Sequence, residues 1–286
     1  MERTQDPLRR YLRRDKKTVT GWLQRVDAEI IGAILDHQRD HGIAGSCVEI
    51  GVHHGKSFIP LCLALRPDEL AMCIDIFDEQ SRNLDASGKG DLDVFMSNLA
   101  RFHIDTSRIR VFKGSSEDVR QDDVLRQVGP VRFFSIDGGH WKSVVRNDLR
   151  LAERSLAAGG VIALDDYCRA EWPEVTAGYT LWQEETESDI VPFAVGSNKL
   201  FLCRRDFAAG YRAALKGAFL SCYWSKTYSS ASMNLDCYRV EPVKQDEESL
   251  AKVIALALKV CRPDLFLALK GGWSRKRQER SSASRT

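Results

Sequence analysis

Short apolar runs alternate with longer amphipathic segments through the middle of the chain. Five of the runs are rich in β-branched residues, and each is followed by a segment long enough to form a helix. The runs cover residues 46–51, 71–77, 108–114, 131–137 and 159–166. Near-continuous apolar strands that alternate with helices are typical of a parallel sheet covered on both faces. The pattern therefore predicts a doubly wound, Rossmann-like α/β fold.

Two further elements flank this alternating region. Before it, Trp22, Val26, Ile30 and Ile34 lie at helical spacing, which predicts an amphipathic helix that ends at Gly42. After it, residues 189–205 read as two strands joined by a tight turn at Ser197-Asn198. Five parallel strands and a C-terminal antiparallel hairpin make a seven-stranded mixed sheet.

The same pattern divides the chain into four segments. We expect a basic N-terminal segment with its helix, a catalytic core, a helical extension and a basic tail. Their bounds are residues 1–43, 44–205, 206–272 and 273–286. The polar, glycine-containing segment 78–90 has the composition of a loop near a ligand.

Composition is that of a globular protein able to bury a core, with 43% hydrophobic and 29% charged residues in 286. No apolar run reaches the roughly 18 residues of a membrane span, and the N-terminus lacks a secretory signal, so we expect a cytoplasmic protein. The eight cysteines are scattered without a CxxC pair, which favours buried free thiols over disulfides or a zinc site. They are residues 47, 62, 73, 168, 203, 222, 237 and 261.

The net charge of +2 is unevenly distributed, because residues 1–17 and 273–286 each contribute about +4. We interpret the basic ends as solvated, disordered termini and expect no nucleic-acid partner. The N-terminal helix is available either to cover a pocket or to form a contact in a homo-oligomer.

In a doubly wound sheet, ligands bind outside the carboxyl ends of the strands. The first predicted strand ends at Glu49 and the turn Gly51–Gly55, where a carboxylate before the first glycine suits a ligand with a cationic amine, although taken alone the glycines fit a purely structural turn equally well. Asp75, which ends the second strand, is placed to bind the hydroxyls of a ribose, although it could instead cap the next helix. Ser115 and Ser116, after the third strand, either bind an adenine edge or cap a helix that begins at Glu117.

The fourth and fifth strands end in Asp137-Gly138-Gly139-His140 and Asp165-Asp166-Tyr167. Three carboxylates in one small region repel each other unless a cation lies between them, and Mg²⁺ prefers oxygen ligands. We therefore predict a divalent-metal site, with His140 as the base that deprotonates a metal-bound hydroxyl. For each acid alone a helix cap is the stronger interpretation, and His140 alone could be a residue at a helix start.

Together these segments resemble the class I S-adenosylmethionine-dependent methyltransferases, and within them the metal-dependent O-methyltransferases of small molecules and sugars. The resemblance covers roughly residues 44–204. It rests on VEIGVHHGKS (48–57), Asp75, FFSIDGGHWKSVVRNDL (133–149), GGVIALDDY (159–167) and PFAVGSNKLFL (192–202).

The resemblance implies a role for each candidate residue. The methionine end of the cofactor would lie against Glu49, the turn from Gly51 through His53 to Gly55, and Ser57. Asp75 would hold the ribose, Ser115 or Ser116 the adenine, and Asp137, Asp165 and Asp166 the metal. The base of such enzymes often lies three residues after the first metal-binding aspartate, the position of His140. A histidine there, rather than the lysine of catechol methyltransferases, favours a sugar hydroxyl as the acceptor, with a small phenol as the second choice.

Three other interpretations compete. The fold could bind NAD, but the glycine pattern GxGxxG is missing. In a methyltransferase without a metal, His140 would be the base and the acids would only cap helices. Loss of activity on adding a chelator would distinguish the metal-dependent enzyme from this one. A non-catalytic binding module with a degenerate pocket is opposed by the intact set of Glu49, Gly51, Gly55 and Asp75.

Overall fold

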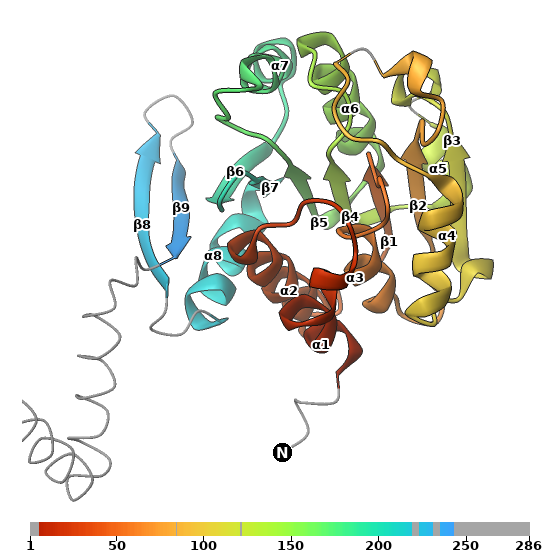
Figure 1. The fold of residues 1–286 in the computed structure, drawn as a ribbon. Coiled ribbons are helices and arrows are strands. Elements are labelled where there is room, and N and C mark those ends of the chain that lie inside the picture. Colours follow the sequence, from red (N-terminus) through yellow and green to blue (C-terminus); the bar gives the residue numbers. More distant parts are fainter. Residues whose placement is uncertain (1–5, 84, 121, 219–222, 231–234, 243–286) are drawn as a thin grey trace, which may run out of the picture. The chain divides into compact units, whose positions relative to one another are not determined.

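The computed structural model of the protein describes residues 6–83, 85–120, 122–218, 223–230 and 235–242. Its centre is one mixed sheet with the strand order β3-β2-β1-β4-β5-β7-β6-β9-β8 (Figure 1). The strands are β1 (Ser46–Ile50), β2 (Ala71–Asp75), β3 (Ile109–Lys113), β4 (Val131–Ile136), β5 (Leu156–Leu164), β6 (Ile190–Val195), β7 (Leu200–Arg204), β8 (Tyr223–Ser230) and β9 (Leu235–Pro242).

The predicted Rossmann-like sheet of seven strands is confirmed, and β9 and β8 extend it to nine beside β6. Strands β1 to β5 pair in parallel, and β7 lies antiparallel between β5 and β6. The hairpin turn is where the sequence placed it, because the Gly196 amide donates to the Lys199 carbonyl at 2.9 Å around Ser197-Asn198. The direction in which successive strands are added to the sheet reverses between β1 and β4, so a crevice at the carboxyl ends of these two strands is the expected ligand site.

The expected helical extension 206–272 is only partly correct. Helix α8 (Arg205–Ala218) begins the segment, but β8 and β9 follow it, and β9 pairs in parallel with β6. The segment 223–230 is rich in residues that favour strands, namely Tyr223, Trp224, Thr227 and Tyr228, but the clearer helical pattern of residues 249–260 obscured this signal. Those residues and the basic tail 273–286 lie outside the described part.

Helices cover both faces of the sheet, as the alternating pattern predicted. One core packs α2 (Arg25–Asp40), α3 (Phe58–Leu63), α4 (Leu92–Arg101) and α8 against the sheet. The opposite core packs α5 (Asp123–Val128), α6 (Lys142–Ser155) and α7 (Pro173–Glu185). Within β1, Cys47 belongs to the first core and Val48 to the second, because successive side chains of a strand point to opposite faces.

The N-terminal segment is tied to the loop that follows β1. It contains α1 (Pro7–Arg13), a single turn (Asp15–Thr18) and α2, which confirms the predicted amphipathic helix. Tyr11 donates its hydroxyl to the Lys56 carbonyl at 2.9 Å, and the Lys56 ammonium donates to the Gly21 carbonyl at 2.6 Å. Trp22 lies before α2 with 68% of its surface exposed, so it is not part of the helix's apolar face.

Three shorter helical turns complete the described elements, at Gln80–Arg82, Thr106–Arg108 and Ser116–Asp118. None of the helices in the described ranges is long and apolar enough to cross a membrane. Five cysteines there are free thiols and four of these are buried, as expected; Cys222, Cys237 and Cys261 lie outside the part whose side chains are described.

Candidate active site

One cavity of about 460 Å³ opens at the carboxyl ends of β1, β2, β3, β4 and β5. Most of the residues singled out in the sequence line it, although they are spread over more than a hundred positions. They are Gly51, His53, Asp75, Ser115, Ser116, Asp137, His140, Asp165 and Asp166. A cavity of this size and place in a doubly wound fold is typical of a site for a small ligand.

The turn after β1 depends on a glycine at position 51. Gly51 has φ of +79°, and a Cβ atom there would lie 1.8 Å from the carbonyl oxygen of Asp137. No other residue type fits so close to the neighbouring strand end. Gly51 therefore allows the ends of β1 and β4 to meet at the cavity floor.

Asp75 braces the far side of that turn. Its carboxylate accepts hydrogen bonds from the amides of His53 (2.7 Å) and Phe77 (2.6 Å). These are loop amides, so Asp75 is not a helix cap, and the capping interpretation is wrong for this residue. Burial raises the pKa of Asp75, while the amide hydrogen bonds oppose that shift. Both oxygens keep further lone pairs with which to accept a hydroxyl proton from a ligand.

The other cofactor-loop residues divide into two groups. Ser115 lines the cavity and also caps the turn at Ser116, because its hydroxyl accepts from the Glu117 amide at 3.3 Å. Ser115 therefore caps this turn, as one of the two interpretations expected, and it also forms part of the cavity wall. His53 has φ of +51° and packs against the exposed Trp22 ring at 5.5 Å. Burial lowers the pKa of His53 to about 4, so its ring is neutral near pH 7.

Three candidates lie behind the cavity wall instead of lining it: Glu49, Gly55 and Ser57. Glu49 is fully buried, and its Oε1 accepts from the Ser135 hydroxyl at 2.9 Å. Burial raises the pKa of Glu49 to about 7. A Cβ atom at Gly55 would lie 3.1 Å from the Phe95 ring, so this glycine serves packing against α4. Ser57 is buried at the start of α3.

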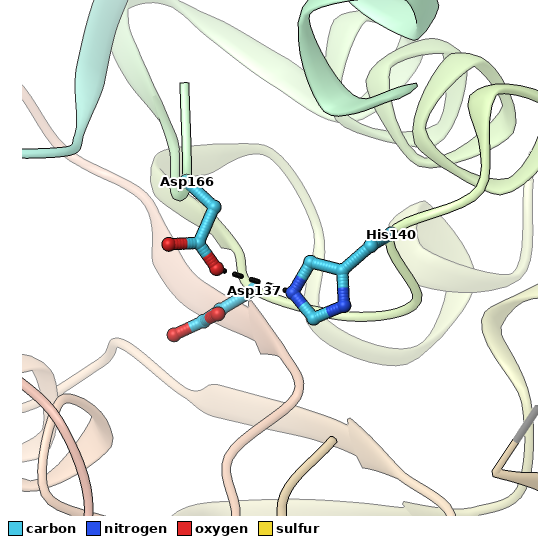
Figure 2. A group of neighbouring side chains, drawn as sticks. All are labelled: Asp137, His140 and Asp166. Atoms are coloured by element: carbon cyan, nitrogen blue, oxygen red, sulfur yellow. Dashed lines mark hydrogen bonds and ion pairs between the residues drawn. The ribbon is translucent and has the colours of Figure 1, made fainter. Parts of the chain in front are cut away.

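Asp137, His140 and Asp166 converge at the centre of the cavity (Figure 2). One ligand atom from each lies within 4.8 Å of the other two, which is a spacing that a metal ion can bridge. Asp137 follows β4, Asp166 follows β5 with φ of +55°, and His140 lies in the loop before α6. The sequence prediction that these strand ends gather acids and an imidazole is therefore confirmed as geometry.

His140 is held from three sides. Its Nδ1 lies 2.7 Å from Asp85 Oδ2, its Nε2 lies 3.1 Å from Asp166 Oδ2, and its ring stacks on Trp172 at 4.0 Å. Burial alone would lower the pKa of His140, but the hydrogen bonds to the two carboxylates outweigh it and raise the pKa. The residue faces the cavity and precedes α6, which begins at Lys142, so it is not a packed helix-start residue.

Asp165 differs from its neighbour in having a cationic partner. Its Oδ2 lies 2.5 Å from the ammonium of Lys199, which is 1% exposed, and its Oδ1 accepts from the Asn198 amide at 2.7 Å. The same ammonium lies 3.8 Å from Asp137 Oδ2. Burial would lower the pKa of Lys199, but Asp165 and Asp137 outweigh burial and raise it. Burial and the Asp165 charge together raise the pKa of Asp137.

Sequence reasoning missed Lys199 and Asp85. Lys199 sits in the hairpin KLFLCR, where only the order of β5, β7 and β6 brings it to the ends of β4 and β5. Asp85 lies in the polar segment 78–90, which the sequence assigned to a loop near a ligand without distinguishing its acids. A lysine directly before an apolar strand was the one available signal, since a buried charge requires a partner.

Comparison with known proteins agrees with this arrangement. Residues 48–167 match the family described as "Methyltransferase domain". Among solved structures, the O-methyltransferase NovP superposes with a TM-score of 0.53 at 13% identity, covering 63% of this chain and 81% of that one. The SAH-bound methyltransferase PaMTH1 from Podospora anserina gives 0.48 at 12% identity, covering 70% and 88%. No curated protein matches the sequence significantly.

Residues 48–167 match the methyltransferase-domain family, and the chain has the fold of the class I S-adenosylmethionine-dependent methyltransferases. The resemblance to that class stated from the sequence is thereby confirmed, whereas the metal-dependent branch stays a prediction.

Proposed function

We propose that the protein transfers a methyl group from S-adenosylmethionine to a hydroxyl oxygen. The observation that carries this proposal is the cluster of Asp137, His140 and Asp166 in the same cavity as the glycine turn and Asp75. A cofactor loop alone fits any class I methyltransferase. A buried imidazole beside carboxylates is the machinery that a hydroxyl acceptor needs, because its oxygen must lose a proton.

The cofactor would lie across the ends of β1, β2 and β3. We assign the ribose hydroxyls to Asp75, the adenine to Ser115 and Ser116, and the methionine end to the loop of Gly51 and His53 with Asp137. Glu49, which lies behind the wall with Gly55 and Ser57, would act through its charge on the cofactor's cationic groups. The missing GxGxxG pattern and the carboxylate before Gly51 oppose a dinucleotide in this place.

The acids suit a divalent cation. Asp137 and Asp166 offer carboxylate oxygens within 4.8 Å of each other and of an imidazole nitrogen of His140, and oxygen ligands are those that Mg²⁺ prefers. We propose Asp137, Asp165 and Asp166 as the ligands, with Asp165 shared with Lys199. The ion when bound would lower the pKa of the acceptor hydroxyl.

The chain's own residues then have separate roles in the transfer. The cavity aligns the acceptor oxygen with the methyl carbon and the sulfur, and it excludes water. His140 Nε2, which faces Asp166, takes the hydroxyl proton as the new O–C bond forms and the S–C bond breaks. The carboxylates of Asp85 and Asp166 stabilise the imidazolium that results.

Aromatic side chains at the mouth of the cavity favour a ring-shaped acceptor. Trp22, Trp141 and Trp172 line the cavity, and the first two are 68% and 42% exposed. Indole rings offer flat apolar faces with a polar edge, which suit a sugar or a phenol. We propose a sugar hydroxyl, free or on a glycosylated metabolite, as the acceptor.

Transfer without a metal is the second candidate, and the position of Lys199 favours it. The ammonium already pairs with Asp165 at 2.5 Å and approaches Asp137, so part of the negative charge is neutralised from within the chain. In that case His140 alone would generate the nucleophile.

An acceptor screen with and without a chelator tests both candidates. Purified protein with labelled S-adenosylmethionine is incubated with monosaccharide glycosides and catechol, in Mg²⁺ or in EDTA. The proposal expects transfer to oxygen that His140→Gln and Asp166→Asn abolish while cofactor binding survives. Full activity in EDTA selects the metal-independent candidate, and full activity of His140→Gln contradicts the base in both.

A further inference from the structure

His140 has a second carboxylate partner that lies outside the strand-end cluster. Asp85 belongs to the segment between β2 and α4, 55 residues before His140 in the chain. Its side chain is 8% exposed, and its Oδ2 lies 2.7 Å from His140 Nδ1 and 3.2 Å from the His140 amide nitrogen. An acid that accepts hydrogen bonds from both the ring and the backbone amide of one histidine fixes the ring relative to the histidine's backbone.

We propose that Asp85 is a positioning residue that keeps the proton of His140 on Nδ1 and so keeps Nε2 facing the cavity. The inference rests on the base role proposed above for Nε2. The nitrogen that carries the proton in a neutral imidazole is set by the hydrogen bond of the other one, and a carboxylate accepts only from N–H. Nε2 faces a second carboxylate, Asp166, at 3.1 Å, so the two acids compete for the single proton of the neutral ring. The shorter Asp85 contact, together with its hydrogen bond from the His140 amide, favours the proton on Nδ1.

The ring has little other freedom. Trp172 stacks on it with an interplanar angle of 11° at 4.0 Å, which leaves rotation within the plane of the stack as the main motion. A hydrogen bond at Nδ1 opposes that rotation. Asp85 and Trp172 together therefore define both the plane and the direction of the imidazole, which proton transfer to Nε2 requires.

Asp85 is itself oriented by its own loop. Its Oδ1 accepts from both the amide (2.9 Å) and the hydroxyl (2.5 Å) of Ser87, which turns Oδ2 toward His140. Asn83 closes the same loop by donating to the carbonyls of Ser87 and Gly88, at 2.7 and 3.2 Å. The loop reaches Asp75 as well, since a Cβ atom at Gly90 would lie 3.2 Å from Asp75 Oδ1. The same segment thus contacts both Asp75, which we propose binds the ribose, and His140, which we propose is the base.

The proton has a defined course in this arrangement. His140 Nε2 takes the acceptor's hydroxyl proton while the methyl group leaves the sulfur, and the ring becomes an imidazolium with both nitrogens protonated. Asp85 keeps its negative charge opposite Nδ1–H and takes no proton. After the methylated product and S-adenosylhomocysteine leave, Nε2 releases its proton to solvent.

Asp85→Asn tests the inference with almost no change in shape. Ser87 donates to the Oδ1 position with its amide and its hydroxyl, at 2.9 and 2.5 Å, whereas only the longer 3.2 Å contact from the His140 amide favours an oxygen at the Oδ2 position. We therefore expect the amide nitrogen of the variant to face His140, where it makes Nδ1 an acceptor. Nitrogen-15 NMR of the cofactor-free protein, at a pH where the ring is neutral, reports the tautomer, and His140→Gln assigns the signal. We expect the proton on Nδ1 in the wild type and on Nε2 in Asp85→Asn. An unchanged tautomer would overturn the proposal.

Activity gives the second readout, with whichever monosaccharide glycoside or catechol turns over fastest. We expect kcat of Asp85→Asn to fall about 100-fold or more, with the acceptor KM and the S-adenosylmethionine affinity nearly unchanged. Asp78→Asn is the matched control, since Asp78 lies in the same segment and pairs with the half-buried Lys113 instead of His140. A kcat within twofold of the wild type in Asp85→Asn, while His140→Gln is inactive, would overturn the positioning role. Full activity in both variants, with the tautomer shifted, would instead contradict the proposed base and leave the positioning intact.

Discussion

Lys199 is the buried cation on which the charge balance of the candidate site depends. Its ammonium is 1% exposed and lies near Asp165 and Asp137, at 2.5 and 3.8 Å. Removing one partner of a buried ion pair leaves an uncompensated charge, which typically costs about 3–5 kcal/mol of unfolding free energy. The pair is therefore a point at which the proposed divalent cation, by binding the same carboxylates, would change the stability of the fold.

We expect Lys199→Met to lower the unfolding free energy by about 3–5 kcal/mol and Mg²⁺ to restore part of that loss. Urea denaturation with and without Mg²⁺ measures both effects. Lys113→Met is the control, because Lys113 pairs with an Asp78 that is 58% exposed, and solvent screening makes such a surface pair contribute little. Equal stability of the Lys199→Met protein and the wild type would contradict the counter-ion role.

The close approach of Gly51 to the end of β4 can be tested by substitution. An alanine there has to avoid the Asp137 carbonyl 1.8 Å from its Cβ, in addition to its backbone strain at φ of +79°. Gly129→Ala is a matched control, because Gly129 has φ of +72° and nothing within 4 Å of its Cβ position. We expect Gly129→Ala to cost about 1–3 kcal/mol and Gly51→Ala clearly more, with loss of S-adenosylmethionine binding by calorimetry. Equal losses in the two variants would show that the close approach of β1 and β4 is unimportant.

At the scale of elements, the N-terminal helix α1 supports the loop after β1. The buried Tyr11 hydroxyl donates to the Lys56 carbonyl, and its loss should cost about 1 kcal/mol. Tyr211→Phe removes a bond from α8 to the Gly159 carbonyl and the oxygen that accepts from Gln38, on an element that does not line the cavity. We expect both variants to lower the melting temperature, Tyr211→Phe at least as much, and only Tyr11→Phe to weaken S-adenosylmethionine binding. Unchanged affinity in Tyr11→Phe would make α1 a packing element alone.

The elements also show where sequence reasoning succeeds. The five parallel strands were predicted to within about three residues, because strands buried on both faces give apolar runs that stand out from amphipathic helices. Helix α7 was not predicted, since Tyr179 and Trp182 are its main apolar anchors among many polar residues. Strands β8 and β9 were mistaken for part of a helical extension.

For the site, the same reasoning works only for residues at strand ends. Asp75, Asp137, His140 and Asp166 could be placed because parallel strands end at one edge of the sheet. Asp85 could not, because its contact with His140 depends on the path of a loop, and loop paths follow from tertiary packing instead of periodicity.

On the scale of the whole molecule, stability should depend on pH through Asp148. This carboxyl is fully buried on α6, where the polar side chains of Ser116 and Asn147 oppose the effect of burial on its pKa without cancelling it. Burial raises the pKa of Asp148 from 3.8 to about 7. An acid with a raised pKa in the folded state binds its proton more tightly there, so folding loses stability as pH rises from the unfolded to the folded pKa.

We therefore expect Asp148→Asn to be more stable than the wild type above pH 7, by up to about 4 kcal/mol, and to lack this advantage below pH 4. Urea denaturation across that pH window measures the difference. Asp68→Asn, at an exposed position, serves as the control and should follow the wild type. A constant difference between Asp148→Asn and the wild type at all pH values would contradict the assignment.

Binding of S-adenosylmethionine is the most direct test of the whole account, because the roles of the loop, the acids and the base all depend on it. Calorimetric titration into the full chain should show saturable binding, with no response to NAD. Asp75→Asn should weaken that binding and Asp78→Asn should leave it unchanged. Saturable binding with this pattern supports a methyltransferase with its ribose at the end of β2. No binding of S-adenosylmethionine at millimolar concentration would contradict the account and leave the cavity to another ligand.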